Sequence, residues 1–313
     1  MPASAPEPLP HAGADYLASS LRGSGQVVFM ANPWTGLVNL LAYAWGAWAG
    51  GASWSVALGA LVGTLVATAA AGLLAGQREE RRAGLYGFNG LLVGAAVPTF
   101  LAPTPAVWAL LVLACAASVG VTHALGRLLA PWRLPGLTFP FIATTWLVLW
   151  VAGPLTGLAT PAAAPALAAP PELGVPDALR AALASVGQVF FVDDAVAGAL
   201  FVLALALQSR RAALLAAGGA LLAVAFAALL GVDRAALLHG LWGYSAVLSA
   251  VAVGGVILPA GRRALACAVL ATLLTVLVQG AGFALAGRVG LPVLTFPFVV
   301  VTWGFLLLCR ARQ

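Results

Sequence analysis

A block of 16 residues is present twice in this chain, and each copy lies near the end of one half of the sequence. LPGLTFPFIATTWLVL occupies residues 134–149 and LPVLTFPFVVVTWGFL occupies residues 291–306, with 10 of 16 positions identical. Two more pairs have similar offsets: GQVVF from Gly25 matches GQVFF from Gly187, and GLYGFNG from Gly84 matches GLWGYSA from Gly240. A repeat this long in an apolar chain predicts two related halves that enclose a substrate path.

The composition places the chain in a membrane. Apolar residues make up 62% and charged residues 8%, which excludes an ordinary soluble domain. Ten apolar stretches, five in each half, are long enough for the ~20 residues that cross a bilayer. An odd number of crossings per half inverts the second half relative to the first. We therefore expect an all-α polytopic membrane protein with two inverted five-helix repeats and broken or re-entrant helices around a central pore.

Arginine predicts the orientation, because all 15 cationic residues are Arg. Alternating the side of the membrane through ten crossings puts twelve of them on the side of the N-terminus, so the positive-inside rule predicts cytoplasmic N- and C-termini. The net charge of +6 reflects this topology, and no basic patch interleaved with aromatic residues suggests nucleic acid.

The same pattern predicts the division of the chain. Residues 1–25 lack the apolar core of a signal peptide and form a cytoplasmic lead. We expect the first repeat half at 26–153, an external linker rich in Pro and Ala at 154–186, the second half at 187–309 and a cytoplasmic tail at 310–313.

Catalysis finds little support in the residues. Asp193 and Asp194 are the only acidic residues inside an apolar segment, and the three histidines are far apart. GxSxG, HExxH and Walker patterns are absent. Cys115, Cys267 and Cys309 show no CxxC or Cys-His spacing, so we expect no enzyme activity, cofactor, metal site or disulfide.

The repeated LTFPF sequence predicts a break in helical structure. Thr138 and Thr295 are placed to cap a helix start, and Pro140 and Pro297 lack the N–H that would bond back along the chain. The carbonyls upstream are then free to accept hydrogen bonds from a passing amide. Such irregular backbone is tolerated in a membrane where it is buried or lines an aqueous path.

Aromatic residues recur at matched positions and predict a flat slot. Two facing rings suit a planar, polar, uncharged solute, whose edges then meet Gln amides, Thr hydroxyls and backbone carbonyls. The matched pairs are Phe29 with Phe191, Phe88 with Tyr244, and Gln26 with Gln188. Gly90 and Gly94 form a small-xxx-small pair that lets another helix approach closely.

Together these blocks resemble the bacterial urea transporters. GLYGFNGLLVG followed by LTFPFIATTW, both repeated with variation, and GQVxF at the start of each half carry the resemblance over Gly25–Leu308. It implies a homotrimer in the bacterial inner (plasma) membrane, in which each protomer conducts urea passively through its own selectivity filter. By position it implies a pore lined by Gln26, Phe29, Phe88, Leu92, Thr138, Gln188, Val189, Phe191, Tyr244, Leu248 and Thr295. Tyr244 differs from the Phe of the family, and Gln188 stands where some relatives carry Glu.

Two alternatives remain at this point. The first is a passive channel for another small neutral solute, such as a short amide, ammonia or water. The second is proton-coupled uptake through Asp193 or Asp194. A carboxylate at the bilayer centre costs ~2.5–3.5 kcal/mol on the mild insertion scale, and both residues lie near the start of a segment, so we expect them to cap a helix.

Overall fold

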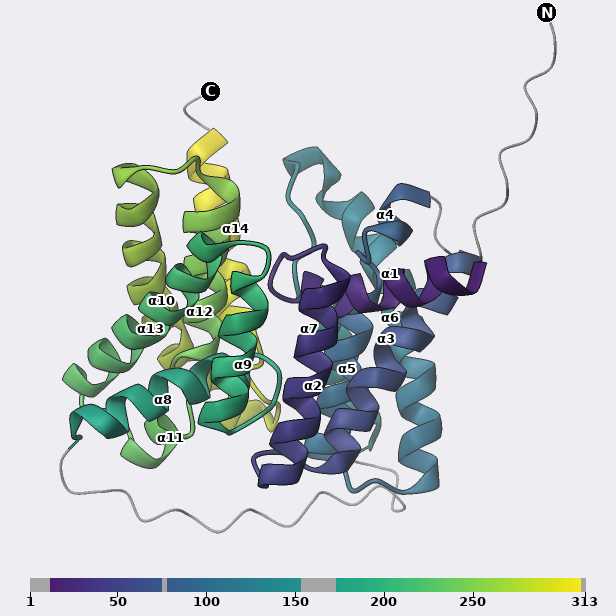
Figure 1. Ribbon diagram of the computed structural model, residues 1–313, viewed down its shortest axis with the longest axis horizontal. Coiled ribbons are helices and arrows are strands. Elements are labelled where there is room, and N and C mark those ends of the chain that lie inside the picture. Colours follow the sequence, from purple (N-terminus) through teal and green to yellow (C-terminus); the bar gives the residue numbers. More distant parts are fainter. Residues whose placement is uncertain (1–11, 75–77, 153–172, 311–313) are drawn as a thin grey trace, which may run out of the picture.

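The computed structural model describes residues 12–74, 78–152 and 173–310, and these residues contain only helices and connecting loops (Figure 1). The first seven α-helices are α1 (Ala12–Gln26), α2 (Pro33–Ala49), α3 (Trp54–Leu74), α4 (Arg78–Arg82), α5 (Gly87–Phe100), α6 (Pro105–Leu129) and α7 (Phe139–Ala152). The remaining seven are α8 (Val175–Gln188), α9 (Ala195–Ala206), α10 (Arg210–Leu229), α11 (Arg234–Leu238), α12 (Tyr244–Val251), α13 (Arg262–Val289) and α14 (Phe296–Arg310). A 3-10 turn (Ala130–Trp132) follows α6, and a π-helix (Ala252–Ile257) continues α12.

The two sets of helices follow the same order, so that α1 corresponds to α8 and α7 to α14. The GQV sequences end α1 and α8, and the GLYG and GLWG sequences lie between a five-residue helix and the next apolar helix. The LTFPF sequences lead directly into α7 and α14. Each repeated block is therefore a junction between helices.

Two helices lie where we expected none. Helix α1 lies almost wholly within the expected N-terminal lead, and α8 occupies the last part of the expected external linker. Both contain many Ala, Ser and Gly residues and are less apolar than the segments that follow them. A search for apolar runs of membrane length misses such helices, because their helical stability comes from packing on neighbours. Helix α1 packs on α2, α3 and α5, and α8 packs on α9 and α10.

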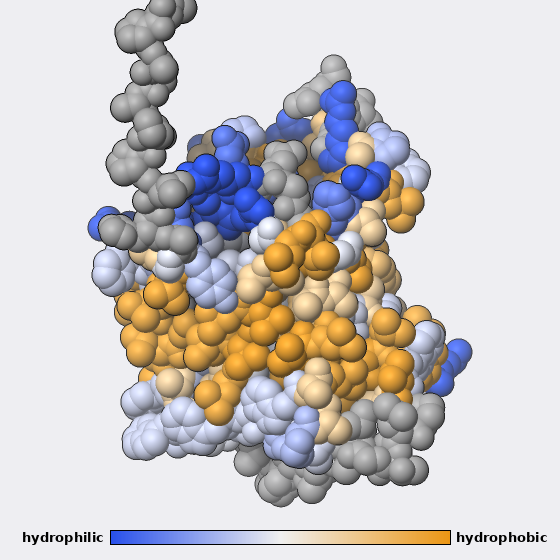
Figure 2. All heavy atoms as spheres, turned by 90° about the vertical axis from the view of Figure 1, so that its right-hand side faces the viewer, coloured by the Kyte–Doolittle hydropathy of each residue, from blue (hydrophilic) through white to orange (hydrophobic). Residues whose placement is uncertain are grey.

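Four of the described helices are long and apolar enough to cross a membrane: α3, α6 with the turn that follows it, α10 and α13. The apolar helices α5, α7, α9, α12 with its π-helix, and α14 are shorter. Figure 2, which views the right-hand side of Figure 1, shows a broad apolar band whose upper edge carries strongly hydrophilic side chains. Leu214 on α10 is 74% exposed, which fits a helix surface that faces lipid.

The short charged helix α4 lies at the upper edge in Figure 1, whereas its counterpart α11 lies at the lower edge. Helix α4 has the sequence REERR, and Arg82 forms an ion pair with Asp15 of α1 at 2.9 Å. The corresponding elements of the two halves thus lie at opposite ends of the apolar band.

Helix starts are fixed by local signals. Asn32 accepts a hydrogen bond from the Trp34 N–H at 2.8 Å, and Pro33 occupies the first position of α2, where its missing N–H costs nothing. Thr104 and Ser209 cap α6 and α10 in the same way.

Helices α3 and α5 pack with their backbones in close contact. A Cβ added to Gly94 would lie 2.0 Å from the Gly59 carbonyl oxygen, and one added to Gly90 would lie 2.3 Å from the Ala67 Cβ. The prediction that Gly90 and Gly94 allow close approach of another helix is confirmed, and that helix is α3.

Candidate functional site

The two LTFPF segments meet at the centre of the molecule. The Thr138 and Thr295 hydroxyl oxygens are 2.6 Å apart and form a hydrogen bond, and the two residues are 3% and 4% exposed. The expected capping role is wrong for Thr138, because the Asn89 side chain of α5 accepts the Phe141 N–H of α7 at 3.2 Å instead. The two threonines therefore join the halves.

Reciprocal contacts surround this threonine pair. The Trp146 indole N–H donates to the Pro292 carbonyl at 2.8 Å, and the Trp303 indole N–H donates to the Pro135 carbonyl at 2.8 Å. Both tryptophans and both prolines are matched pairs of the repeated block. Each half thus makes the same contact with the other, as in an isologous interface between two subunits.

The predicted phenylalanines make reciprocal contacts too. Phe29 lies edge to face with Phe298 of α14, at a centroid distance of 6.2 Å. Phe191 lies edge to face with Phe141 of α7, at 6.1 Å. Phe141 and Phe298 are matched positions of the repeat, so each GQVxF phenylalanine packs against the LTFPF helix of the opposite half. Neither Phe141 nor Phe298 was predicted for the site, although both belong to the repeated block.

The backbone is strained at the same places in both halves. Phe29 and Phe191 have φ of 66° and 60°, and Leu137 and Leu294 have φ of 50° and 51°. A side-chain-bearing residue in this left-handed region costs ~1–3 kcal/mol and persists only where its surroundings require it. Occurrence in pairs indicates that the conformation is a requirement of the site, and no residue pattern in the sequence predicts it.

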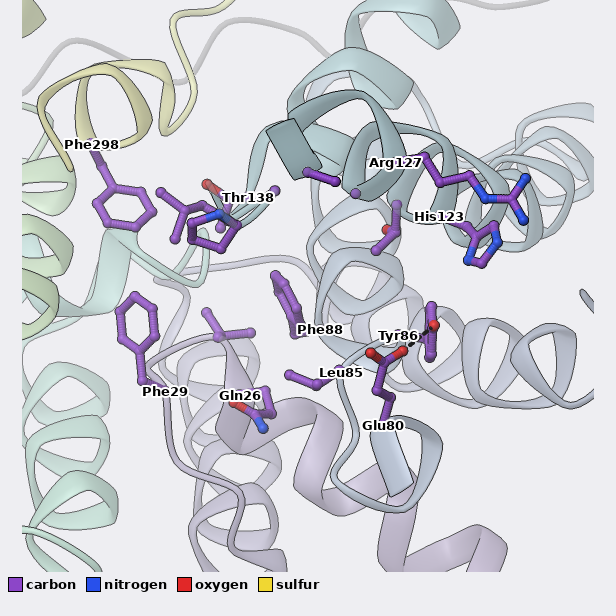
Figure 3. A pocket seen from close by; sticks show the side chains of 17 residues that line it. Gln26, Phe29, Glu80, Leu85, Tyr86, Phe88, His123, Arg127, Thr138 and Phe298 are labelled. Carbon is purple, nitrogen blue, oxygen red and sulfur yellow. Dashed lines mark hydrogen bonds between the residues drawn. The ribbon is translucent and has the colours of Figure 1, made fainter. Parts of the chain in front are cut away.

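A cavity of about 550 Å³ opens on one side of the threonine pair (Figure 3). Gln26, Phe29, Phe88 and Thr138 of the predicted set lie on its wall. Figure 3 shows Phe29 and Phe298 together, with Phe88 and Thr138 beside the same space. Seven predicted residues do not line this cavity: Leu92, Gln188, Val189, Phe191, Tyr244, Leu248 and Thr295.

Three titratable side chains that we did not predict for the site also lie on this wall. Glu80, His123 and Arg127 line the cavity. Tyr86, in the turn before α5, donates to the Glu80 carboxylate at 2.6 Å. Burial, followed by the hydrogen bond and the charge of Glu80, raises the pKa of Tyr86 to about 12, so the phenol keeps its proton at neutral pH. Position in the repeat gives no signal for these residues, because their counterparts are not charged.

The two predicted glutamines have different surroundings. The Gln26 side-chain amide donates to the Ala83 carbonyl at 3.0 Å, which ties the end of α1 to the loop after α4. Among the described residues, Gln188 has no side-chain partner and is half-buried, and the adjacent Val189 is buried.

In the second half, Tyr244 and Leu248 are packed away from solvent. Tyr244 donates its hydroxyl proton to the Leu294 carbonyl at 2.7 Å and accepts a hydrogen bond from the Gln279 amide at 3.0 Å. Leu248 is 1% exposed, and Leu92, at the matching position of the first half, is 0% exposed.

Asp193 and Asp194 differ in role. The Asp194 carboxylate accepts the Ala197 N–H at 2.7 Å and the Trp45 indole N–H at 3.1 Å, so its predicted role as the cap of α9 is confirmed. The same prediction is wrong for Asp193, whose carboxylate contacts the His239 ring after α11. The contact between Asp193 and His239 could not be predicted from the sequence, because the two residues belong to separate segments.

Comparison with known proteins agrees with this geometry. The sequence profile of the urea transporter family matches residues 17–310. Urea transporter 1 of sheep (Ovis aries) is 33% identical over 300 residues, covering 92% of this chain and 76% of the relative, and the goat (Capra hircus) protein gives the same values. Urea transporter 1 of rat (Rattus norvegicus) is 32% identical over 296 residues with the same coverage. The chain is therefore a multi-pass membrane protein that belongs to the urea transporter family, a family of transport proteins and not of enzymes.

Proposed function

We propose that the protein conducts urea passively across a membrane, through a path between its two halves that passes the Thr138–Thr295 pair. The observation that carries the proposal is the coincidence of three features at this pair: reciprocal contacts between the halves, left-handed backbone in both copies, and a cavity that reaches Thr138. In transporters that are built from two internal repeats, the substrate site lies at the interface between the repeats.

The proposed chemistry is exchange of hydrogen bonds. Urea is planar and uncharged, with N–H donors and a carbonyl acceptor at its edge. Phe29 and Phe88 offer ring faces to the plane of the solute. The two threonines exchange the hydrogen bond between their hydroxyls for bonds to urea, and Gln26 orients the inner end of the path. None of the residues proposed for the filter carries a charged side chain, so its apolar walls exclude ions.

The proposed architecture is two inverted halves. The opposite placement of α4 and α11 in Figure 1 supports inversion, as does the odd number of apolar segments in each half. We assign the halves to residues 26–153 and 187–309, with ten crossings in total, some of them broken at the LTFPF segments. The arginine bias supports cytoplasmic termini. A bacterial inner membrane and a homotrimer with one path per protomer follow from the family resemblance, and native mass spectrometry of the detergent-solubilised protein tests the trimer.

The other predicted residues complete the proposed filter: Leu92, Gln188, Val189, Phe191, Tyr244, Leu248 and Thr295. Five of these residues are buried, and Gln188 and Phe191 are half-buried, which supports a narrow path at these residues. Short amides, ammonia and water are the other neutral solutes that this filter would be tested against.

Proton-coupled uptake is the second candidate, and the Asp193–His239 contact is the observation that favours it. A carboxylate in contact with an imidazole is the kind of side-chain pair that proton relays in transporters use. Coupling requires flux to collapse when a protonophore removes the proton gradient, whereas passive flux is indifferent to it.

The test is stopped-flow urea flux in proteoliposomes, with and without a protonophore, against acetamide, ammonia and water. We expect fast, saturable and protonophore-insensitive urea flux. In Thr138→Val plus Thr295→Val, urea flux should fall roughly 10- to 100-fold, because one or two hydrogen bonds at the barrier are lost.

The matched control is Thr145→Val plus Thr302→Val. These threonines lie further along the same two helices, and their buried hydroxyls have no hydrogen-bond partner in the structure. Urea flux of the control should equal that of the wild type. Unchanged flux in the folded Thr138/Thr295 double variant would remove the assigned role, and wild-type flux no faster than that of empty liposomes would remove urea as the solute.

A further inference from the structure

Residues that line the cavity and their counterparts in the second half have different surroundings. Four residues that line the cavity are Phe88, Thr122, Leu137 and Thr138. Their counterparts, 156 or 157 residues later in the chain, are Tyr244, Gln279, Leu294 and Thr295. None of these four counterparts is more than 9% exposed. The repeat is therefore open on one side of the threonine pair and filled on the other.

A short relay of hydrogen bonds fills the second side. Gln279, on α13, donates its side-chain N–H to the Tyr244 hydroxyl oxygen at 3.0 Å, and Tyr244 donates its proton to the Leu294 carbonyl at 2.7 Å. The Leu294 carbonyl lies directly before Thr295, at the left-handed residue of the LTFPF segment. The relay thus covers one of the backbone acceptors that the segment would otherwise present.

The described residues of the first half form no such relay. Phe88 lacks the hydroxyl of Tyr244, and Thr122 at the position of Gln279 accepts a hydrogen bond from Asn89 at 3.3 Å. The Phe141 N–H, four residues after Leu137, also goes to Asn89. No described residue donates to the Leu137 carbonyl, and Leu137 lines the cavity.

Packing alone does not account for Gln279. Its side chain is fully buried, and its amide oxygen has no hydrogen-bond partner among the described residues. A buried acceptor without a donor destabilises a protein, and an apolar side chain of similar length would avoid that loss. The one bond that the amide makes is the bond to Tyr244.

We propose that Gln279 is a positioning residue for the urea path: it holds the Tyr244 hydroxyl on the Leu294 carbonyl, so that the second half of the filter offers the solute one backbone acceptor fewer than the first half. This inference rests on the proposed function. The second half then selects by ring surface and size, while urea N–H groups are bound mainly at the first half and at the threonine pair.

The test compares Tyr244→Phe, Gln279→Met and the double variant by the concentration dependence of urea flux. Tyr244→Phe uncovers the Leu294 carbonyl, so the half-saturating urea concentration should fall on the order of fivefold, the factor supplied by one net hydrogen bond. When Tyr244 is present, Gln279→Met should also lower the half-saturating urea concentration. In the Tyr244→Phe background Gln279→Met should have no further effect, because the group it positions is gone. An equal effect in both backgrounds, or none in either, would overturn the proposal.

A matched control and a second readout separate this outcome from failure of the urea assignment. Thr275→Val alters a buried polar residue one turn earlier on α13, whose hydroxyl bonds to Ser249 and the Ala271 carbonyl, and it should leave the half-saturating concentration unchanged. Thermal unfolding of the same four proteins of the cycle in detergent measures the coupling between Gln279 and Tyr244 without transport. If Gln279 and Tyr244 are coupled in thermal unfolding but the wild-type protein shows no urea flux, the relay is supported and urea is rejected as the solute. If the two residues show no coupling in unfolding, the relay is rejected whatever the urea flux.

Discussion

Several polar side chains in this protein bond to backbone atoms of other elements. Asn89 of α5 supplies the acceptor for the first free N–H of α7, and Thr35 of α2 donates to the Ala204 carbonyl of α9 at 2.9 Å. In an apolar environment an unpaired backbone group is costly. These side chains therefore fix where the short helices begin and how they meet.

The Asp194 cap gives a prediction at this scale. Asp194→Ala removes the acceptor of the Ala197 N–H and should lower the stability of the protein by ~0.5–2 kcal/mol, measured as thermal unfolding in detergent. Asp194→Asn keeps the capping oxygen and is the control, with a much smaller loss. A loss as large in Asp194→Asn as in Asp194→Ala would mean that the charge, and not the cap, is what stabilises α9.

At the scale of elements, close packing of α3 on α5 holds the helix that carries Phe88. Gly59 and Gly63 of α3 face Gly94 and Gly90 of α5. The backbones approach so closely that no side chain fits between them. The position of Phe88 at the cavity thus depends on glycines outside the cavity.

Gly94→Ala should therefore destabilise the protein, since its Cβ would lie 2.0 Å from the Gly59 carbonyl oxygen. We expect a loss of ~1–3 kcal/mol, typical of overpacking, together with reduced urea flux as α5 shifts. The control is Gly120→Ala in the middle of α6, where an added Cβ meets nothing within 4 Å. There the change should be neutral or stabilising by up to ~1 kcal/mol, because alanine is the better helix former. Both are measured by thermal unfolding, and equal melting temperatures would contradict the packing argument.

At the scale of the whole molecule, the halves are joined by matched contacts. The threonine pair, the two Trp–Pro hydrogen bonds and the two edge-to-face phenylalanine pairs all relate a residue of one half to the repeated block of the other. Such reciprocity is what an approximate two-fold relation between the halves produces. The cavity lies beside residues of the first half and the hydrogen-bond relay lies in the second half, so the two halves depart from the two-fold relation at these positions.

The inverted arrangement predicts the accessibility of the loops. After Cys115, Cys267 and Cys309 are replaced, single cysteines at position 78 and at position 262 should react with an impermeant maleimide from the cytoplasmic side. A cysteine at position 234, in α11, should react only from the opposite side. Reaction of positions 78 and 234 from the same side would contradict the inversion, whatever the solute that the protein carries.

The features that depend on local residue patterns could be predicted without the structure. Composition and apolar runs gave the membrane class, and the repeated motifs gave the family and located Gln26, Phe29, Phe88 and Thr138, which line the cavity. Capping by Asp194 was also predictable, because a cap acts within one turn of its own helix.

The tertiary structure decided what depends on contacts between distant segments. The sequence did not indicate that Thr138 bonds to Thr295 instead of capping α7, that Asp193 contacts His239, or that Gln279 reaches Tyr244. A helix period shows which side chains share a face, but the partner of that face is set by how the helices cross. The repeat implies two equivalent sites, and only packing shows that one side of the threonine pair is open and the other filled.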